Sequence, residues 1–452
     1  MKIDAKLTPE DLTRPASRVL ELAGDKARAL DSAWDPSLGT PVFTASGKYT
    51  TRGWTEWTQG FQYGIPILAF DGTDQRDLLE LGRAKTLQNM AAHVSHIGVH
   101  DHGFNNLSTY GNLRRLMREK RIETNHWELA FYELAIKTSG AIQAARWADT
   151  ADGGYIYSFN GPHSLFIDTM RSLRILGVAH QLGHALTGEN DGKISLLDRL
   201  IAHGKTTASF NIYYGTGRDN YDKPPLRGRT AHEAIFNRND GRYRCPNSQQ
   251  GYSPFSTWTR GLAWAILGFA EELEFLRNIK MEIGGDTRNI FEKAATAAAD
   301  FYLDQATAAD GIPYWDTGAP NLYHLGDWRS RDAEPFNEHE PVDSSAAAIA
   351  AQGLLRLGKY LGDKGARYLA AGLTVARTLF GGQYLAESPQ HQGLILHSIY
   401  HRPNGWDYIP PGRKIPCGES SLWGDYHAVE LAVYLQRLAA GKKYLTFFDS
   451  ED

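Results

Sequence analysis

The chain has 452 residues and a formal net charge of −4; 42% of its residues are hydrophobic and 22% are charged. These values are ordinary for a globular protein, and they leave no basic field that would attract nucleic acid or an anionic membrane. The sequence has no run of about 18 apolar residues, which excludes a membrane-spanning helix. Its two cysteines, Cys245 and Cys417, match no metal-ligand spacing and suit a reducing compartment.

Apolar residues recur at helical spacing along most of the chain, whereas strand-like alternation is confined to short pieces such as GYIYSF and GLILHSIY. No Pro- or Ser-rich linker divides the chain. We therefore predict an all-α fold in a single domain over residues 1–452, in which six helical hairpins close into a ring. The expected helices cover residues 8–32, 58–70, 74–97, 108–119, 125–143, 165–186, 190–206, 258–277, 284–309, 343–361, 363–380 and 425–438.

The segments between these helices concentrate Trp, Tyr, His, Asp and Gly, as in GVHDHGFNN, GIPYWDTGAPN and PCGESSLWGDYH. Aromatic rings beside short polar groups suit a sugar, because its C–H faces stack on rings while its hydroxyl groups need hydrogen bonds. A large ring of helices can also bury Trp near its loops for packing alone. The loops at one end of the ring are therefore the predicted place for a site.

Asp101 lies in HDHGF, between His100 and His102 and just before a helix. An Asp at such a place is often a helix N-cap or a turn residue. The two histidines raise the alternative of a metal site, but the triplet has no further ligand at helical spacing. We therefore expect neither a metal nor a cofactor.

Asp168 lies in the apolar run SLFIDTMRSLRIL. Apolar neighbours would remove water from this carboxyl group, raise its pKa and keep it protonated, as a general acid requires. The alternative is a structural pair with Arg171 or Ser172, three and four residues later on the same helix face. An Arg171 pair would lower the pKa, so the residues alone leave both readings open.

The segment QGYSPFSTWTRGLAWAI places several unusual residues at a helix start. Arg260 is an excellent partner for a carboxylate and has Trp264 one turn later, but it could equally brace a loop by stacking on Trp. Gln250 lies ten residues before Arg260. His232, in TAHEAIF, reads by itself as a structural histidine.

Several of these motifs together resemble the unsaturated glucuronyl hydrolase family. The segment QGYSPFSTWTRGLAWAI is similar to the family's Q-G-Y-S-x-x-S-x-W-x-R-G-Q-A-W, HDHGF to its H-D-x-G-F, and FIDTM to its I-D-N-M-M-N. Other segments of the chain match family motifs in the family's order, and the resemblance runs from about residue 54 to residue 435. These segments are WTQGFQYG, IPYWDTGAP, DSSAAAIAAQGLLRL, LHSIYHRP and ESSLWGDYHAVE.

The resemblance implies an (α/α)6 barrel and removal of a 4,5-unsaturated glucuronic acid from the non-reducing end of lyase-generated oligosaccharides by hydration of a vinyl ether. It identifies Asp168 with the general acid/base and Asp101 with a second essential carboxylate. It assigns the binding of the substrate, an unsaturated oligosaccharide, to Trp57, His232, Gln250, Arg260 and Trp264.

The sequence departs from the family pattern at Thr169, Arg171, Ser172 and Leu262. An unsaturated rhamnogalacturonyl hydrolase stays open as an alternative, as does a sugar epimerase or isomerase of the same barrel shape. The longer basic segment over residues 213–229 could be a solvated insertion or could read an anionic group on the leaving sugar.

The stretch MKIDAKLTPEDL lacks the apolar segment of a signal peptide, so we expect a cytoplasmic protein. A periplasmic location stays open if a signal peptide has been removed. We expect no nucleic-acid or membrane partner, and a monomer or a weak homo-oligomer.

Overall fold

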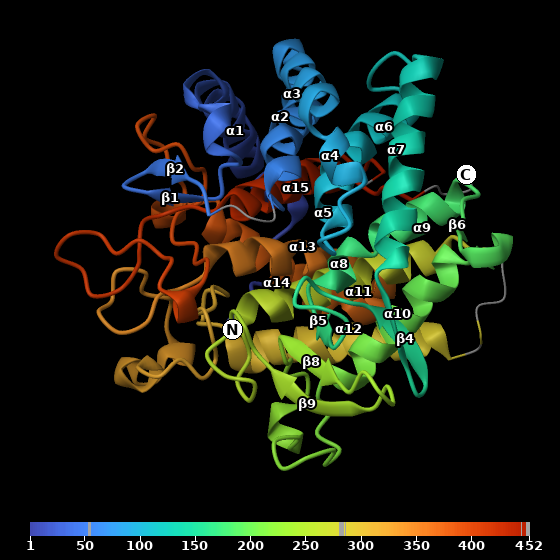
Figure 1. Cartoon of the computed structure of the whole chain (residues 1–452). Coiled ribbons are helices and arrows are strands. Elements are labelled where there is room, and N and C mark those ends of the chain that lie inside the picture. The colour runs from blue at the N-terminus through green and yellow to red at the C-terminus, as the bar shows by residue number, and fades with distance from the viewer. Residues whose placement is uncertain (53–55, 280–283, 285, 444, 449–452) are drawn as a thin grey trace.

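The computed structural model describes residues 1–52, 56–279, 284, 286–443 and 445–448. Its helices form an inner and an outer ring, and they alternate between the two rings along the chain (Figure 1). The inner ring holds α2 (Gln59–Thr73), α5 (His102–Asn106) with a π-helical turn (Leu107–Gly111) and α6 (Asn112–Arg118), α8 (Thr169–Ser172) with α9 (Arg174–Gln181), α11 (Thr259–Arg277), α13 (Ser344–Leu361) and α15 (Leu422–Ala439).

The outer ring covers these segments with one helix for each. It consists of α1 (Thr13–Ala33), α3 (Arg76–Asn89), α7 (His126–Ala145), α10 (Leu196–Phe210), α12 (Thr287–Phe301) and α14 (Ala366–Leu379). Each inner segment contacts the next, and α15 returns to contact α2, so the ring is closed. This arrangement confirms the predicted (α/α)6 barrel.

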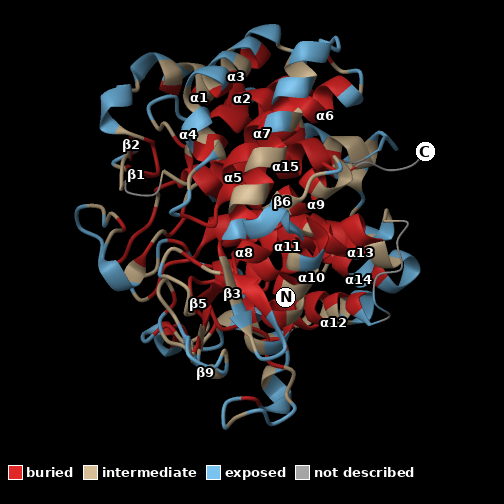
Figure 2. Ribbon diagram, turned by 45° about the vertical axis from the view of Figure 1, so that its right-hand side comes forward, coloured by how far each residue is buried: buried red, intermediate tan, exposed pale blue. Residues whose placement is uncertain are grey.

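Burial explains why some helices become the inner wall. All residues of α11 from Thr259 to Leu276 and all residues of α13 from Ser344 to Gly358 are buried, whereas α7 alternates between buried and exposed positions (Figure 2). Glycines let the inner helices approach one another closely. A Cβ built on Gly353 would lie 2.7 Å from the backbone nitrogen of Leu267, so any side chain there would force α13 and α11 apart.

Polar side chains begin several helices as the N-cap preference predicts. Asp343 accepts hydrogen bonds from the amides of Ser345 and Ala346 at the start of α13, and Asn125 caps α7 in the same way. The caps fix the helix starts, and the loops before the inner helices are held at one end of the barrel.

Short strands lie in the segments that connect the helices. They are β1 (Phe43–Ala45), β2 (Lys48–Thr50), β3 (Trp147–Thr150), β4 (Gly153–Ile156), β5 (Ser164–Phe166), β6 (Leu186–Thr187), β7 (Lys193–Ile194), β8 (Glu233–Phe236) and β9 (Tyr243–Asn247). The strands β5, β8 and β9 form an antiparallel sheet beside α8 and α11, and β1–β2, β3–β4 and β6–β7 are hairpins.

The predicted helices are confirmed with shifted ends, and two predictions need correction. The run 165–186 begins as strand β5, and its helices occupy only Thr169–Ser172 and Arg174–Gln181, because Leu165 and Phe166 pair with β8. The run 190–206 becomes helical only at Leu196, after a short turn and β7.

GYIYSF (residues 154–159) overlaps strand β4, as predicted, but GLILHSIY forms only one isolated bridge, from Ile395 to Leu385. Residue 285 of the predicted helix 284–309 and Trp54, where the family resemblance starts, lie outside the described residues. None of the described helices combines the length and the apolar character that crossing a bilayer requires.

Candidate active site

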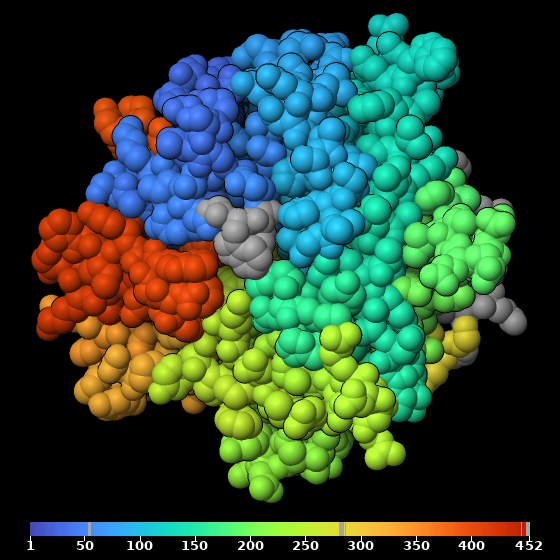
Figure 3. Space-filling model, viewed as in Figure 1, coloured from blue at the N-terminus to red at the C-terminus, as the bar shows by residue number. Residues whose placement is uncertain are grey.

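A cavity of about 620 Å³ opens among the loops at one end of the barrel. Figure 3 shows parts of the chain that are far apart in sequence meeting near the middle of this face. The predicted residues, with the exception of His232, line the cavity. The lining comprises Trp57, His100, Asp101, Phe104, Phe159, Asp168, Gln249, Gln250, Trp258, Arg260, Trp264, Tyr400, His401 and Trp406.

Asp101 occupies the N-cap position of α5, but its side chain makes no capping hydrogen bond. The carboxylate faces the cavity instead, and the loop that carries it is fixed by Ser172 of α8. The Ser172 hydroxyl accepts a hydrogen bond from the Gly103 amide (2.9 Å) and donates one to the His100 carbonyl (2.7 Å). A Cβ on Gly103 would lie 2.1 Å from the Ser172 carbonyl oxygen, so only glycine allows this approach.

Asp168 lies where strand β5 passes into α8. The pairing of β5 with β8 places Phe166 opposite Glu233, and the Ile167 amide donates to the carbonyl of His232, which precedes β8. Arg171 and Ser172, the alternative structural partners of Asp168, bind other residues. Arg171 binds Glu271 and Glu430, and the Ser172 hydroxyl binds the α5 loop, so neither residue explains why a carboxyl group lies here.

A histidine joins the two carboxyl groups into one buried cluster. His100 Nε2 lies 3.6 Å from Asp168 Oδ1 and 3.9 Å from Asp101 Oδ1. Burial by itself lowers the pKa of His100, but Asp101 and Asp168 outweigh it and raise that pKa above its ordinary value. Burial raises the pKa of Asp101, and the charge of Asp168 adds to the effect while His100 opposes it.

The sequence left the direction of the Asp168 pKa shift open, and the structure favours a lowered pKa, although Arg171 is not the cause. Burial does favour its protonated form, as its apolar neighbours suggested, but the adjacent His100 prevails and holds the pKa of Asp168 below its ordinary value. The two carboxylates thus favour the protonated form of His100, and His100 in turn favours the ionised form of Asp168. Groups coupled this closely titrate as a unit.

His232 packs behind Asp168 but does not line the cavity itself. Its Nδ1 accepts hydrogen bonds from the backbone amides of Gln249 (3.0 Å) and Gln250 (3.3 Å), which assigns the ring proton to Nε2 when the ring is neutral. Burial lowers the pKa of His232 to about 4, so the ring is neutral near pH 7. The ring lies between Phe166 and Trp258, with centroids 4.4 Å and 4.7 Å away.

Arg260 organises the opposite wall. Its guanidinium is buried, pairs with Asp343 at 3.0 Å, donates to the carbonyls of Ile399 and Tyr400, and donates to Gln250 Oε1 at 2.8 Å. The guanidinium lies over Trp258 and Trp423, so Arg260 does stack on tryptophan, as one of the two interpretations of the sequence expected. Arg260 thus braces two loops and orients the Gln250 amide, which combines both readings that the sequence left open.

Aromatic rings form much of the remaining surface. Trp57 stacks on Trp423 with ring centroids 5.1 Å apart, and Trp264 packs against Phe104 at 5.0 Å and against His427 at 5.0 Å. Sequence reasoning did not assign a site role to His100, Phe104, Phe159, Gln249, Trp258, Tyr400, His401 or Trp406, which also line the cavity. The aromatic segment YHRPNGW was the available signal for the last three of these residues.

The geometry around the H-D-H triplet does not favour a metal site. His102 points away from Asp101, with Nδ1 2.8 Å from the Ser139 hydroxyl and Nε2 2.9 Å from the His96 carbonyl. Burial lowers the pKa of His102 to about 3. Within the described ranges, no group of three or more His, Cys, Asp or Glu side chains is arranged to hold a metal ion.

The basic segment over residues 213–229 lies outside this cavity's lining. Arg227 pairs with Asp300 at 3.2 Å, and Arg229 is buried with its guanidinium 3.7 Å from the Tyr213 ring centroid. The segment thus uses these two arginines for its own packing.

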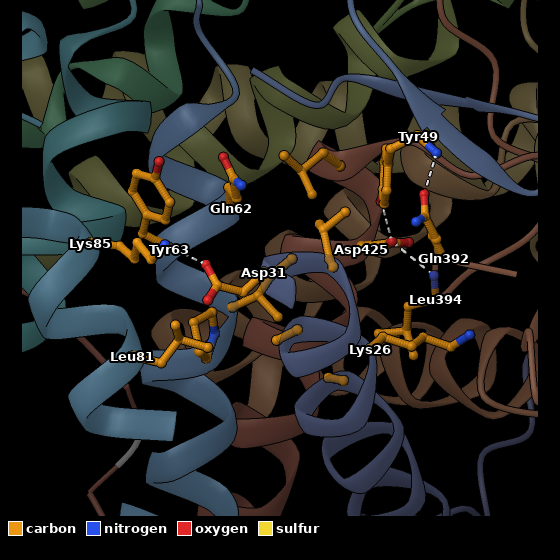
Figure 4. A pocket seen from close by; sticks show the side chains of 16 residues that line it. Lys26, Asp31, Tyr49, Gln62, Tyr63, Leu81, Lys85, Gln392, Leu394 and Asp425 are labelled. Carbon is orange, nitrogen blue, oxygen red and sulfur yellow. Dashed lines mark hydrogen bonds and ion pairs between the residues drawn. The ribbon is translucent and has the colours of Figure 1, made fainter. Parts of the chain in front are cut away.

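A second cavity, of about 510 Å³, lies between α1, α2, α3 and the start of α15 (Figure 4). Its polar groups satisfy one another. Asp425 accepts from the Tyr49 hydroxyl (2.5 Å) and the Leu394 amide (2.8 Å), and Lys85 pairs with Asp31 (2.7 Å). Burial raises the pKa of Asp425 to about 6. None of the predicted site residues lines this second cavity.

Known proteins resemble the chain over most of its length, although no family model matches it. It is 26% identical over 416 residues to an unsaturated glucuronyl hydrolase of Bacillus sp. (strain GL1), covering 89% of this chain and 92% of the relative. It is 25% identical over 434 residues to an unsaturated chondroitin disaccharide hydrolase of Streptococcus pyogenes serotype M1, covering 94% and 91%.

Solved structures share the fold. The unsaturated glucuronyl hydrolase of Bacillus sp. GL1 superimposes with a TM-score of 0.69 at 24% identity, covering 94% of this chain and 97% of the other. The Streptococcus agalactiae hydrolase gives 0.70 at 21% identity, covering 99% and 95%. A variant of the latter bound to dGlcA-GalNAc6S gives 0.63 at 20% identity, covering 96% and 93%.

The matching relatives and the shared barrel agree with the order of the sequence motifs. The chain is therefore similar to unsaturated glucuronyl hydrolases over most of its length, which supports the family resemblance that the sequence motifs indicated.

Proposed function

We propose that this enzyme removes a 4,5-unsaturated glucuronic acid from the non-reducing end of oligosaccharides that polysaccharide lyases produce. The observation that supports this most is the cavity itself, in which Asp101 and Asp168 meet around His100 within a wall of aromatic side chains. Aromatic faces suit the C–H faces of a sugar, and paired carboxyl groups supply proton transfer.

The substrate is an enol ether, which determines the chemistry. Protonation at C4 moves positive character to C5 and the ring oxygen, and water then adds at C5. The resulting hemiketal opens, the leaving sugar departs, and an open keto-uronate forms. Because the bond to the anomeric carbon is not displaced, the separation of the two carboxyl groups does not report retention or inversion here.

In this proposal Asp168 donates the proton to C4, and its carboxylate then accepts a proton from the attacking water. Asp101 holds sugar hydroxyl groups and keeps negative charge beside the cluster. His232 offers its Nε2–H to the substrate, and Gln250, oriented by Arg260, offers its amide NH2. Trp57 and Trp264 provide stacking faces.

Loss of the ultraviolet absorbance of the conjugated enol ether tests the function directly. A panel of unsaturated disaccharides, including one derived from rhamnogalacturonan, should identify at least one whose absorbance decays with enzyme. In heavy water, the product should carry deuterium at C4, read by NMR at early times, before protons beside the new ketone exchange. Displacement at the anomeric carbon would retain the double bond at first and leave C4 unlabelled. No decay with any member of the panel would reject the hydrolase and favour the epimerase or a sugar-binding role.

Gly103→Ala tests whether the contact between α5 and α8 positions the carboxyl groups. A methyl group there would collide with the Ser172 carbonyl and move Asp101 away from Asp168. We expect kcat/KM on the unsaturated disaccharide to fall by about 10- to 100-fold, because displacing a reacting group by about 1 Å has costs of this order.

The matched control is Gly284→Ala, where the added Cβ would meet nothing within 4 Å. Its kcat/KM should equal that of the wild type. Equal activity of Gly103→Ala and the wild type, at similar Tm, would show that this approach does not set the catalytic geometry.

The compartment and the assembly are proposals as well. Cys245 and Cys417 are both free thiols, which supports a cytoplasmic location. We also propose that the protein works as a monomer or a weak homo-oligomer.

A further inference from the structure

His100 is buried in an unusual environment. Its side chain is 1% exposed, and neither ring nitrogen has a hydrogen-bond partner among the described residues. Phe159 stacks on the ring and Phe166 meets it edge-on, with centroids 5.8 Å and 5.5 Å away. A neutral buried imidazole normally has a hydrogen-bond partner for at least one ring nitrogen, so another interaction must stabilise the buried ring of His100. The two carboxylates near Nε2 provide it, because they attract the cationic form.

The other ionisable groups near His100 do not compete for this proton. Arg146 is positive and only opposes the cation. His203 and His232 feel the charge of His100, and burial lowers the pKa of His203 to about 3 and that of His232 to about 4. Both are therefore neutral near pH 7. The proton of the free enzyme remains within the cluster of His100, Asp101 and Asp168.

This placement leaves a step unexplained in the reaction as proposed. Asp168 must carry a proton to deliver it to C4, but beside a cationic His100 it is ionised in the free enzyme. We propose that His100 stores the catalytic proton and passes it to Asp168 when substrate fills the cavity, which makes His100 a positioning residue for the acid. The inference rests on the proposed function of Asp168.

Unequal exposure gives the physical reason for the transfer. The Asp168 side chain is 13% exposed and that of His100 only 1%, so a bound sugar removes water from Asp168 and hardly changes the surroundings of His100. Desolvation disfavours the carboxylate and raises its proton affinity. The ion pair between cationic His100 and the Asp168 carboxylate lacks a good hydrogen bond, so its attraction does not repay the cost of removing both charges from water. The neutral pair of imidazole and carboxylic acid therefore becomes the more stable form.

The protons balance over the cycle. His100 Nε2 gives its proton to Asp168 Oδ1, and Asp168 gives it to C4 of the substrate. Water then adds its oxygen at C5 and releases a proton to the Asp168 carboxylate, from which His100 recovers it when the products leave. The net reaction consumes one water molecule, and the enzyme ends in its starting protonation state.

The pH profile of kcat/KM in His100→Asn distinguishes a proton store from a packing role. Without the imidazole, the single proton must be held by the two carboxyl groups, which release it at lower pH than the histidine. We expect the alkaline limb to move toward acid by about one pH unit or more, with activity near pH 5 reduced far less than activity near pH 8. A uniform loss at all pH values with an unmoved limb would overturn the inference.

His203→Asn is the matched control, because His203 is equally buried, lies near the cluster and is neutral across this pH range. Its alkaline limb should coincide with that of the wild type even if its rate falls. His100→Gln repeats the test with a longer neutral side chain.

A pH titration of the ligand-free enzyme, followed by NMR, tests whether His100 holds the proton when no reaction takes place. The His100 ring signals, assigned by their absence in His100→Asn or His100→Gln, should titrate above pH 6.5. In Asp168→Asn they should titrate at lower pH, because one carboxylate is gone. If neither His100 variant folds, selective labelling assigns the signal, and a wild-type midpoint below 6.5 overturns the inference.

The outcomes separate the two proposals. Failure to consume any unsaturated disaccharide rejects the proposed function, while the NMR titration still tests the histidine. Normal turnover with an inactive Asp168→Asn variant and an unmoved His100→Asn limb rejects only the proton store.

Discussion

Replacing Asp168 with Asn should abolish turnover and leave substrate binding largely intact. The amide has nearly the shape of the carboxyl group and still fits between β5 and α8, but it cannot donate a proton to C4 and recover one from water. General acid–base catalysis contributes about 10²- to 10⁴-fold, so kcat should fall by at least this order. Decay of the enol-ether absorbance gives the rate, and quenching of tryptophan fluorescence from the lined cavity gives the binding.

Asp198→Asn is the control, because this exposed carboxylate lies in the first turn of α10, away from the residues that line the cavity. Its rate should equal that of the wild type. Asp168→Glu should retain measurable activity, because the acid survives at a displaced position. A rate above about a hundredth of wild type in Asp168→Asn would show that another group protonates C4.

The barrel could be predicted because its helices carry strong local signals. Long amphipathic runs such as α1 and α13 keep their periodicity and their caps within the segment itself. The run at 165–186 could not be resolved in this way, because an apolar stretch fits a buried strand and a buried helix equally well. Its start becomes a strand only through pairing with β8, about seventy residues away in the chain.

The site residues came from the family resemblance, since the single-residue arguments left them open. The pKa of Asp168 shows why physics from local sequence was insufficient. Its apolar neighbours were visible and correctly indicated burial, but the deciding partner, His100, is remote in the chain and is brought near by the contact of Gly103 with Ser172. The partners of Arg260 could not be predicted for the same reason, because Asp343 and Trp423 reach it from other inner helices.

On the core side of α8, the inner helices enclose a cluster of alternating charges. Arg171 is its centre, fully buried, with Nε 3.0 Å from Glu271 and Nη2 2.6 Å from Glu430. It also donates to His427 Nε2, and the His427 ring packs against Trp264 of the cavity. The remaining charged members are Arg174, Glu274 and Arg356.

Arg171→Met should therefore lower the free energy of unfolding by about 3–5 kcal/mol. The substitution removes a positive charge that compensates the buried carboxylates of Glu271 and Glu430, which water does not reach. Urea unfolding monitored by circular dichroism measures the loss. Arg83→Met is the matched control, since Arg83 makes comparable pairs with Glu80 and Glu128 at the surface. It should cost about 0–1 kcal/mol.

The double variant Arg171→Met/Glu430→Gln separates charge imbalance from lost packing. The wild-type arginines hold the pKa of Glu430 well below its ordinary value, although burial opposes them. Without Arg171 that pKa rises, so the single variant should regain stability relative to wild type as the pH falls and Glu430 takes up a proton. Removing the carboxylate in the double variant should make it more stable than Arg171→Met near pH 7. If the double variant is instead less stable and the deficit of Arg171→Met does not change with pH, the cost comes from the cavity that the shorter side chain leaves, and the charge network contributes little.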